Sequence, residues 1–408
     1  MQRRIFMRLV GGGTVAAATA SLGACSSAFP PEALAPWAGP GAEPDLRRWA
    51  LAHAILAPSP HNRQPWLADL READAIVLHV DRTRLLPETD PWSRQIVIGQ
   101  GTFLEALVLA LQARGLAPAV TLFPEGEFRP REVDDRPVAR VTWSGAGPGD
   151  GSGAGPTAEP GAGPARAPDP LFAQLRERCT AKVDYDTARP VAPATLGTLG
   201  AALVDADVAF GGTVEAPRVE RLRRLCWESA LVELTTPRTV MESVRLTRVG
   251  PGEIALHRDG ISINALVPRV ANAVGAFDRT QPPAPGSTAY KQMTSRFEGH
   301  SRTAMGFVWL STPTARHAAA GTLRSAEVAA GRAYLRLQLK ATELGLQMHP
   351  MSQAPQEFAE MRAHYDELHR LLLGVPATER TVQMFCRVGY CAPTQHQPRR
   401  GVDAIVRS

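Results

Sequence analysis

The stretch Ala57-Pro58-Ser59-Pro60-His61-Asn62-Arg63-Gln64-Pro65-Trp66 is the most informative part of this 408-residue sequence. It follows a segment, Leu46 to Leu56, whose apolar residues recur at helical spacing. Prolines then end the helix and stiffen a loop in which Ser59, Asn62 and Gln64 can donate and accept hydrogen bonds. Such side chains suit the edge of a planar heterocycle with alternating N–H and C=O groups. A helix end that runs into a polar turn is the alternative that composition alone allows.

The order of residues in this loop resembles the nitroreductase superfamily of FMN-dependent oxidoreductases. There, a helix followed by A-P-S-x-x-N-x-Q-P-W lies against the isoalloxazine ring of the flavin. The resemblance implies FMN as the cofactor, with Ser59, Asn62 and Gln64 on the ring, and redox chemistry carried by the flavin itself. No catalytic side chain and no metal is then required. The sequence contains no zinc-binding HExxH motif, no nucleophile elbow and no P-loop.

A second motif, Arg178-Cys179-Thr180-Ala181-Lys182, resembles the R-R-S-x-R segment of the same superfamily. The resemblance implies that Arg178 and Lys182 grip the ribityl chain and phosphate of the flavin. Cys179 and Lys182 stand where arginine is usual, and a lysine supplies charge without the planar fork of a guanidinium. A solvated helix end is the alternative interpretation of this segment.

A third motif, Leu344 to Ser352, resembles the helix-end loop that passes under the reactive edge of the flavin. The resemblance implies backbone N–H groups near Ser352 and Gln353 that face flavin N5. It places three residues at the cofactor: Pro350, Met351 and Ser352. His349 could donate a proton or serve a structural role, and the Met351 side chain also fits simple core packing.

A fourth motif begins at Arg387-Val388-Gly389-Tyr390 and leads to Pro398-Arg399-Arg400. The superfamily often ends with a strand and an arginine that pairs with the FMN phosphate. The resemblance therefore implies phosphate contacts from Arg399 and Arg400, because a guanidinium binds phosphate in a bidentate manner. A basic tail in solvent is the alternative.

Residues 1–25 resemble a twin-arginine export signal with a lipoprotein processing box. Arg3-Arg4-Ile5-Phe6-Met7-Arg8 supplies the paired arginines, and Leu9 to Ala24 is too short and too weakly apolar to span a membrane. Leu22-Gly23-Ala24-Cys25 would make Cys25 the lipidated first residue; a small-residue cleavage site with an incidental cysteine is the alternative. These features predict a periplasmic protein, or a lipoprotein held at the membrane surface by one lipid attachment.

Composition narrows the remaining choices. A hydrophobic content of 44% is enough for one large core or two. Three of the basic residues behind the formal charge of +5 lie in the first eight positions, and no basic run is interleaved with aromatics, so no nucleic-acid partner is expected. Five cysteines are too few for a disulfide framework in a chain of this length, and whether Cys386 and Cys391 are bonded stays open.

The chain divides at a Gly/Ala/Pro-rich linker, residues 144–168, into halves at 45–143 and 169–400. Segment 272–294 is expected to form a long loop or lid. Periodicity predicts helices at Leu46–Leu56, Ile98–Arg114, Leu171–Arg178, Pro217–Leu234 and Ala326–Leu344, and strands at Ala75–Val80, Ala119–Phe123, Val138–Trp143, Ala304–Leu310 and Thr381–Val388. This mixture indicates an α+β fold with antiparallel-rich sheets packed with helices.

The motifs are distributed unequally between the halves. The loop at 57–66 occurs only in the first half, whereas the phosphate and N5 motifs occur only in the second. Nitroreductases share two flavin sites across a dimer interface. The chain therefore resembles the single-chain, internally duplicated, exported subgroup of that superfamily, and we expect a monomeric pseudo-dimer with one FMN site.

The resemblance implies an oxidoreductase that acts on small electrophiles, such as nitro-aromatics or quinones, with an electron donor that the sequence does not identify. NAD(P)H is scarce outside the cytoplasm, so a flavin-binding or flavin-sequestering protein without turnover is an open alternative. A third alternative is a flavin-free lipoprotein that uses the fold as a binding module.

Overall fold

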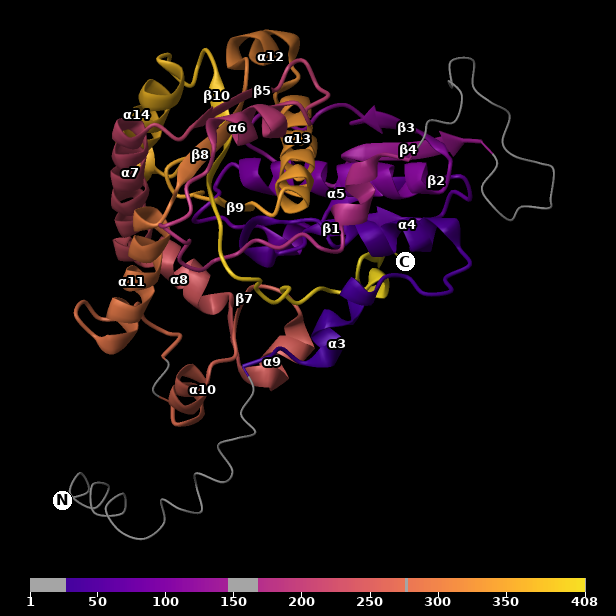
Figure 1. Ribbon diagram of the computed structural model, residues 1–408. Coiled ribbons are helices and arrows are strands. Elements are labelled where there is room, and N and C mark those ends of the chain that lie inside the picture. Colours follow the sequence, from indigo (N-terminus) through magenta and orange to yellow (C-terminus); the bar gives the residue numbers. More distant parts are fainter. Residues whose placement is uncertain (1–26, 146–167, 276–277, 408) are drawn as a thin grey trace.

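The computed structural model of the chain describes residues 27–145, 168–275 and 278–407. The predicted export signal, its Cys25 and nearly all of the 144–168 linker lie outside the described residues, so these assignments and the domain boundaries stay predictions. The described part contains two principal antiparallel-rich sheets with helices packed between and around them (Figure 1). The predicted α+β fold class is confirmed.

The first sheet has the strand order β11-β1-β2-β4-β3. Its strands are β1 (Trp66–Asp69), β2 (Ala75–Val80), β3 (Ala117–Leu122), β4 (Ala139–Ser144) and β11 (Val406–Arg407). All pairs are antiparallel except β1 with β11, which brings the C-terminal end of the chain onto the edge of the N-terminal sheet.

The second sheet has the order β5-β8-β10-β9 and is wholly antiparallel. Its strands are β5 (Ala209–Thr213), β8 (Gly306–Thr312), β9 (Gln347–Pro350) and β10 (Thr381–Gly389). A separate pair of short parallel strands, β6 (Thr247–Val249) and β7 (Ile261–Ile263), lies in the connection between β5 and β8.

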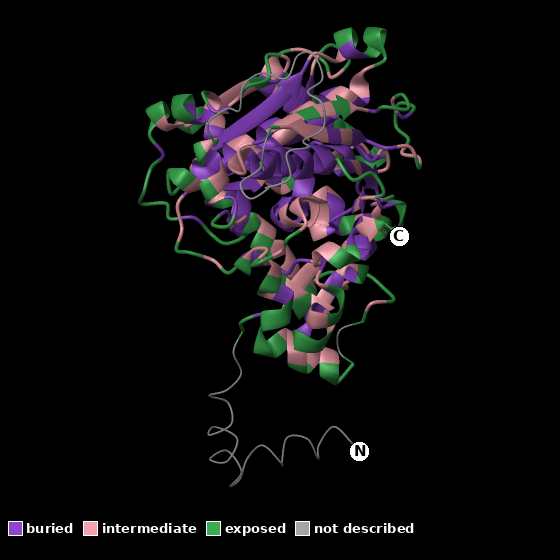
Figure 2. Cartoon of the chain, turned by 90° about the vertical axis from the view of Figure 1, so that its right-hand side faces the viewer, coloured by how far each residue is buried: buried purple, intermediate pink, exposed green. Residues whose placement is uncertain are grey.

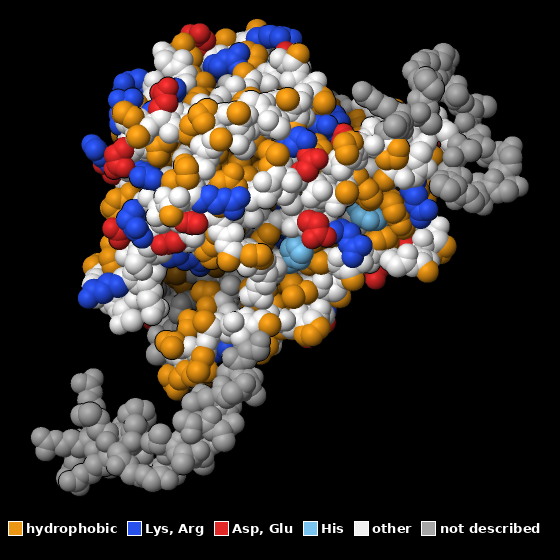
Figure 3. All heavy atoms as spheres, viewed as in Figure 1, with side chains coloured by type: hydrophobic (Ala, Val, Ile, Leu, Met, Phe, Trp, Pro, Cys, Tyr) orange, Lys and Arg blue, Asp and Glu red, His pale blue; other side chains and the backbone are white. Residues whose placement is uncertain are grey.

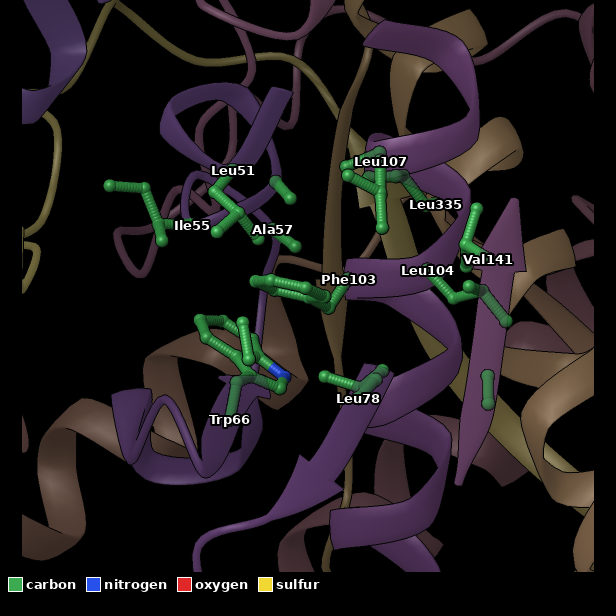
Figure 4. Packing of buried hydrophobic residues seen from close by; sticks show 14 of the residues in the cluster. Leu51, Ile55, Ala57, Trp66, Leu78, Phe103, Leu104, Leu107, Val141 and Leu335 are labelled. Atoms are coloured by element: carbon green, nitrogen blue, oxygen red, sulfur yellow. The ribbon is translucent and has the colours of Figure 1, made fainter. Parts of the chain in front are cut away.

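Two long helices, α5 (Arg94–Ala113) and α13 (Leu323–Glu343), pack against each other at the centre. They cross at Gly101 and Gly331, where a methyl group on either glycine would overlap a backbone carbonyl of the opposite helix. Helix α5 is long and apolar enough to cross a membrane, but nearly all of it is buried, as expected for the core helix of a globular protein. Figure 4 shows Phe103, Leu104 and Leu107 of α5 in this core, together with Leu335 of α13.

The other helices, of which α7 is as long as α5, cover the sheets and the lower end of the molecule. They are α3 (Pro31–Leu34), α4 (Leu46–Ala54), α6 (Pro193–Gly200), α7 (Ala216–Thr235), α8 (Pro237–Arg245), α9 (Gly250–His257), α10 (Leu266–Ala273), α11 (Thr288–Arg302), α12 (Thr314–Ala320) and α14 (Arg362–Leu373), with 3₁₀ turns at Ala35–Ala38, Pro60–Asn62, Arg82–Arg84, Pro170–Gln174, Ala359–Met361 and Val402–Ala404. Figure 2 shows that the lower end is mostly exposed or half-buried, whereas buried residues fill the body above it.

All five predicted strands form, and the one at Ala75–Val80 was predicted with its observed bounds. Three predictions were wrong in part. The helix expected at Leu171–Arg178 is only the 3₁₀ turn Pro170–Gln174, because the chain then turns Arg178 into the protein interior. The expected loop at 272–294 contains the end of α10 and the start of α11, whose first turn is capped by the Ser287 hydroxyl. Gln347–Pro350 is strand β9 rather than loop, because it pairs with β10.

Candidate functional site

A cavity of about 680 Å³ lies where the two halves of the chain meet. Its inner wall is formed by the loop at 58–62, the first half of α5 and the segment 178–182. Strand β9 and the residues that follow it close one side, and residues 396–399 approach from the C-terminal segment. Helices α8, α10 and α11 and the strand pair β6–β7 form the outer wall.

The loop at 58–62 has an unusual backbone. His61, Asn62 and Gln64 all have positive φ, between 46° and 51°, in the left-handed region that residues other than glycine rarely adopt. The Ser59 hydroxyl accepts a hydrogen bond from Gln64 N at 2.9 Å and closes the turn. Three such residues in one short loop cost free energy, and that cost is typical of loops shaped to contact a ligand.

Helix α5 holds this loop in place. The Thr102 hydroxyl donates to Pro58 O at 2.7 Å, and Gln100 Nε2 donates to Pro65 O at 2.8 Å. Gly99 lets the loop approach closely, since a methyl group there would lie 3.3 Å from Pro60 Cδ. Trp66 Nε1 donates to the Gly99 carbonyl from the other end of the loop. The loop is therefore fixed by the core rather than by its own residues alone.

Two buried guanidinium groups meet beside the loop. Arg178 and Arg399 are each 3% exposed, and both lie over the Trp37 ring, 5.4 and 5.2 Å from its centroid. Arg178 donates to Leu56 O and to the Gln338 side chain, whereas Arg399 donates to the Asn62 amide oxygen and to backbone carbonyls. Neither forms an ion pair with a described residue. Burial, and then Arg178, lowers the pKa of Arg399 well below its ordinary value.

Two more cations line the same cavity without a carboxylate partner among the described residues. Lys182 and Arg296 are exposed residues at the wall of the cavity, where nearby protein atoms reduce the hydration of their charges. Burial, and then Arg296, lowers the pKa of Lys182 to about 8. Arg387 fixes the backbone on either side of Lys182 by donating to the carbonyls of Ala181 and Val183. Arg178, Arg399, Lys182 and Arg296 therefore give this part of the cavity a positive charge that suits an anion.

Glu233 is the one carboxylate among the described residues that line this cavity. It lies near the end of α7, is 2% exposed, and accepts hydrogen bonds from Gln356 Nε2 at 2.7 Å and from the Gln353 side chain. Burial raises the pKa of Glu233 to about 7, although the two glutamines and Lys182 oppose this shift. Glu233 can therefore hold or release a proton near neutral pH.

His349 presents a fixed donor to the cavity. Arg387 Nε donates to His349 Nδ1 at 3.0 Å, and because a guanidinium can only donate, Nδ1 must accept. The ring proton of neutral His349 is therefore on Nε2, which donates to no described residue. Burial, and then Arg387, holds the pKa of His349 well below its ordinary value, and burial lowers that of the neighbouring His300 to about 3. Both rings are neutral at physiological pH.

The backbone after β9 leaves two donors free. Met351 N donates to Phe385 O at 2.8 Å, but the N–H groups of Ser352 and Gln353 donate to no acceptor in the described part of the chain. Both residues line the cavity. The Tyr334 hydroxyl, on α13 at the cavity wall, is also buried without a partner among the described residues.

The structure brings together eight of the ten described residues that the sequence assigns to the cofactor: Ser59, Asn62, Arg178, Lys182, Pro350, Met351, Ser352 and Arg399. Gln64 and Arg400 do not line the cavity. Gln64 is fully buried and donates to Asn62 O and Arg258 O, while its side-chain oxygen accepts from Arg400 N. Arg400 bonds the backbone of Gln64 and Ala404. These two side chains join the loop to the C-terminal segment, away from the residues that line the cavity.

Sequence reasoning missed Trp37, Glu233, Arg296 and Tyr334. Trp37 lies in a short 3₁₀ turn near the start of the described chain, and the other three occupy ordinary helical positions. No local motif marks them, because each reaches the cavity only through tertiary packing. Of the predicted loop at 272–294, Pro283, Thr288, Ala289, Gln292 and Met293 do line the cavity.

Comparison with known proteins gives partial matches. No family model matches the chain. Over 80 residues it is 35% identical to acg of Mycobacterium tuberculosis, whose name assigns it to the NAD(P)H nitroreductases; the match covers 20% of this chain and 24% of that protein. Over 79 residues it is 38% identical to an uncharacterized protein of the same species, covering 19% and 23%. The matched stretch thus spans about a quarter of these curated relatives.

Among solved structures, a nitroreductase with bound FMN from Bacteroides fragilis aligns with a TM-score of 0.32 and 14% identity, over 57% of this chain and 95% of that one. The FMN-dependent nitroreductase NfnB from Mycobacterium smegmatis, in complex with NADPH, aligns with a TM-score of 0.33 and 18% identity, over 58% and 96%. TM-scores this low carry no inference about this chain, so its function has to be inferred from the residues of the cavity.

Proposed function

We propose that the chain binds FMN in this cavity and acts as a nitroreductase-like oxidoreductase on small electrophiles such as nitro-aromatics or quinones. One observation carries the proposal: two buried arginines without anionic partners converge on a cavity that the strained loop at 58–62 also lines. Of the protein's local relatives, acg carries the nitroreductase name, which agrees with this assignment.

The cationic end of the cavity fits a phosphate. An unpaired buried guanidinium is costly, and a phosphate that accepts hydrogen bonds from Arg178 and Arg399 would remove that cost. Lys182 and Arg296 add positive charge to the same cavity. Binding of a dianion is therefore favoured over binding of a neutral ligand.

The rest of the cavity fits a planar ring with polar edges. Ser59 and Asn62 line one side, and the free N–H groups of Ser352 and Gln353 and the Nε2–H of His349 line another. FMN, when bound, supplies two-electron transfer. The chain contributes fixed donors that favour negative charge near them. Glu233, with a pKa near 7, can hold a proton within the same cavity.

The repeated topology supports the proposal that the chain is an internally duplicated pseudo-dimer. Strands β1, β2, β3 and β4 have the order β1-β2-β4-β3, and strands β5, β8, β9 and β10 have the corresponding order β5-β8-β10-β9. In each half the long helix, α5 or α13, lies between the second and third strand in sequence. A monomer of this kind would hold its FMN between its own two halves.

The ends of these two helices are also alike. Each is followed by a glycine with positive φ, Gly115 at 76° and Gly345 at 65°. The next residue, Leu116 or Leu346, donates its N–H to the carbonyl five residues earlier, at 3.2 or 2.8 Å. This is the glycine-capped helix end that leads directly into a strand, and it is repeated in both halves.

The sequence of residues 1–25 supports export by the twin-arginine route, and we propose that the protein acts in the periplasm or at the membrane surface. A route that carries folded proteins lets a non-covalent cofactor be bound before export. The electron donor would then be a partner available outside the cytoplasm.

The visible absorbance spectrum of protein purified from cells with intact export tests the proposal. About one released FMN per chain is the expected result, and two per chain would overturn the single-site pseudo-dimer. No flavin, even after FMN is added to the apoprotein, would overturn the function. Reduction of the bound flavin by a donor, and its reoxidation by a nitro compound or quinone, separates an enzyme from a protein that only stores FMN.

A further inference from the structure

The outer wall of the cavity carries an apolar surface that faces solvent. Among the described residues, eight large apolar side chains are exposed, and five of them lie on α9, on α10 or at the C-cap of α10. We call these five the α10 patch: Leu256, Leu266, Val267, Val270 and Val274, between 39% and 77% exposed. None of the eight residues of α10 is buried.

Four residues of the α10 patch belong to α10 or its C-cap, and Leu256 belongs to α9. Leu266, Val270 and Val274 recur at intervals of four, so they lie above one another along α10. Arg269 and Asn272 occupy other faces, which makes the helix amphipathic, and its exposed apolar face continues through Val267 to the cavity wall. Figure 3 shows hydrophobic side chains gathered at the lower end of the molecule, where Figure 1 places α10. A solvent-facing apolar patch of this kind marks an interaction surface.

The start of the described chain lies beside this patch. Asn264, two residues before α10, donates from Nδ2 to Ala28 O at 2.5 Å, and Phe29 packs with Ile254 of α9. The 26 residues that precede Ser27 therefore join the described structure at the base of α10. Any membrane attachment within them would bring the α10 patch close to the bilayer.

The charge around the patch suits an anionic lipid surface. Residues 253–293 contain four basic residues, Arg258, Arg269, Arg279 and Lys291, and three carboxylates, of which Glu253 pairs with Arg279 at 2.8 Å. Asp259 is buried in ion pairs with Arg63, Arg84 and Arg248, so Arg258, Arg269 and Lys291 remain against the exposed Asp278. Amphipathic helices with basic flanks bind the interface of anionic bilayers.

We propose that the α10 patch docks on the surface of an anionic lipid bilayer. Val267, Pro268 and Ala271 of the same helix line the cavity, so docking would place the outer wall of the cavity at the membrane. Apolar compounds dissolved in the bilayer would then have the shortest path to the site. The proposal goes beyond the flavin site, and its test needs no flavin, so its failure would leave the proposed function standing.

Two variants with matched chemistry test the proposal. Val274 is 73% exposed in the α10 patch, and Val204 is 74% exposed elsewhere, so Val274→Asp and Val204→Asp add the same charge at equally exposed positions. Both are made in the full chain with Cys25→Ser, which removes the predicted lipidation site. In sedimentation with phosphatidylethanolamine/phosphatidylglycerol vesicles, Val274→Asp is expected to weaken binding by roughly tenfold and Val204→Asp by less than about twofold. Equal effects of the two variants would overturn the proposal.

Hydrogen exchange shows which surface is covered. With vesicles present, the backbone amides of α10 are expected to exchange more slowly, whereas those of the exposed helix α12 are not. Vesicle binding without protection of α10 would assign the contact to the N-terminal segment and overturn the proposal. Protection of α10 without vesicles at high protein concentration, lost in Val274→Asp, would assign the patch to a second copy of the chain and also overturn it.

Discussion

The two halves of the molecule share a scaffold but not a site. Both contain four antiparallel strands in the same order and a long central helix in the same place. They differ in the link between their first two strands. Residues 70–74 join β1 to β2, whereas residues 214–305 join β5 to β8 and contain α7 to α11.

This difference assigns separate tasks to the halves. The first half supplies the strained loop at 58–62 and the helix that holds it. The second half supplies Arg178, Lys182, the strand β9 and, within its long insertion, the outer wall of the cavity. The first half therefore fixes the shape of the site, and the second half supplies its positive charge and its outer wall. The variants that follow show how far the two halves depend on each other.

The largest effect is expected at the joint between the first half and the insertion. Asp259, 3% exposed, pairs with Arg63 and Arg84 of the first half and with Arg248 of the insertion, at 3.1, 2.7 and 3.0 Å. Asp259→Asn would leave three arginines without their shared anion. It should lower the free energy of unfolding by about 4 kcal/mol, measured by urea denaturation.

The control for that variant is Asp403→Asn. Asp403 pairs with Arg48, but its side chain is 88% exposed, so the loss should be less than about 1 kcal/mol. Equal losses from the two variants would mean that the buried cluster does not join the halves.

The second-largest effect is expected where α5 and α13 cross. A methyl group at Gly101 would overlap the Val328 carbonyl and force the two helices apart, so Gly101→Ala should cost about 3 kcal/mol in the free energy of unfolding. Gly197→Ala is the control, because Gly197 lies in α6 with no atom near its missing Cβ. That variant should gain about 1 kcal/mol from helix propensity. A neutral Gly101→Ala would show that the halves are packed less tightly than the structure indicates.

The sequence predicted the strands and central helices of the two sheets better than the helices within residues 214–305. Strands such as Ala75–Val80 and the long helices α5 and α13 are long or continuously apolar segments, because a sheet or a core buries them. Helices α8, α9 and α10 are only eight or nine residues long, so each offers too few turns for its period to be recognised in the sequence.

Residues of the candidate site were predicted where a short sequence motif marks them. Arg178 and Arg399 were assigned to the FMN phosphate from motifs more than 200 residues apart, and the structure places both in one cavity, while the phosphate contact stays a prediction. Gln64 and Arg400 were also assigned to the cofactor, but neither lines the cavity, and both form hydrogen bonds to other parts of the protein. Glu233 carries no local signal, because only the folding of α7 over the cavity gives it a role.

Substitutions of the neighbouring residues Arg399 and Arg400 test whether the cavity binds the phosphate of FMN. Arg399 lines the cavity and Arg400 does not, so Arg399→Gln should weaken FMN binding by roughly 100-fold, and Arg400→Gln by much less. The FMN affinity of Arg399→Lys should lie between those of the wild type and Arg399→Gln, because lysine keeps the positive charge but lacks the planar guanidinium that binds phosphate with two hydrogen bonds. Fluorescence titration of apoprotein with FMN measures all three. Equal losses at 399 and 400 would indicate a general effect on the C-terminal segment rather than a phosphate contact.

The smallest expected effect concerns the acid that the insertion adds to the cavity. Because burial raises the folded-state pKa of Glu233 to about 7, the folded apoprotein binds the proton more tightly than the unfolded chain does. This contribution to stability is complete below pH 4 and is lost as the pH rises through 7. Glu233→Gln removes the titration, so the variant should gain stability relative to wild type as pH rises, from near zero at pH 4 to about 2 kcal/mol at pH 6.

The pH dependence of FMN binding gives a second measurement of the Glu233 ionisation. An ionised Glu233 repels a phosphate, so FMN affinity of the wild type should fall as pH rises through 7, and again above 8 as Lys182 loses its proton. Glu233→Gln should abolish the first fall and keep the second, whereas Lys182→Met should do the reverse. If Glu233→Gln left both falls unchanged, the acid on α7 would not act on the site, and the insertion would cover the cavity without tuning its charge.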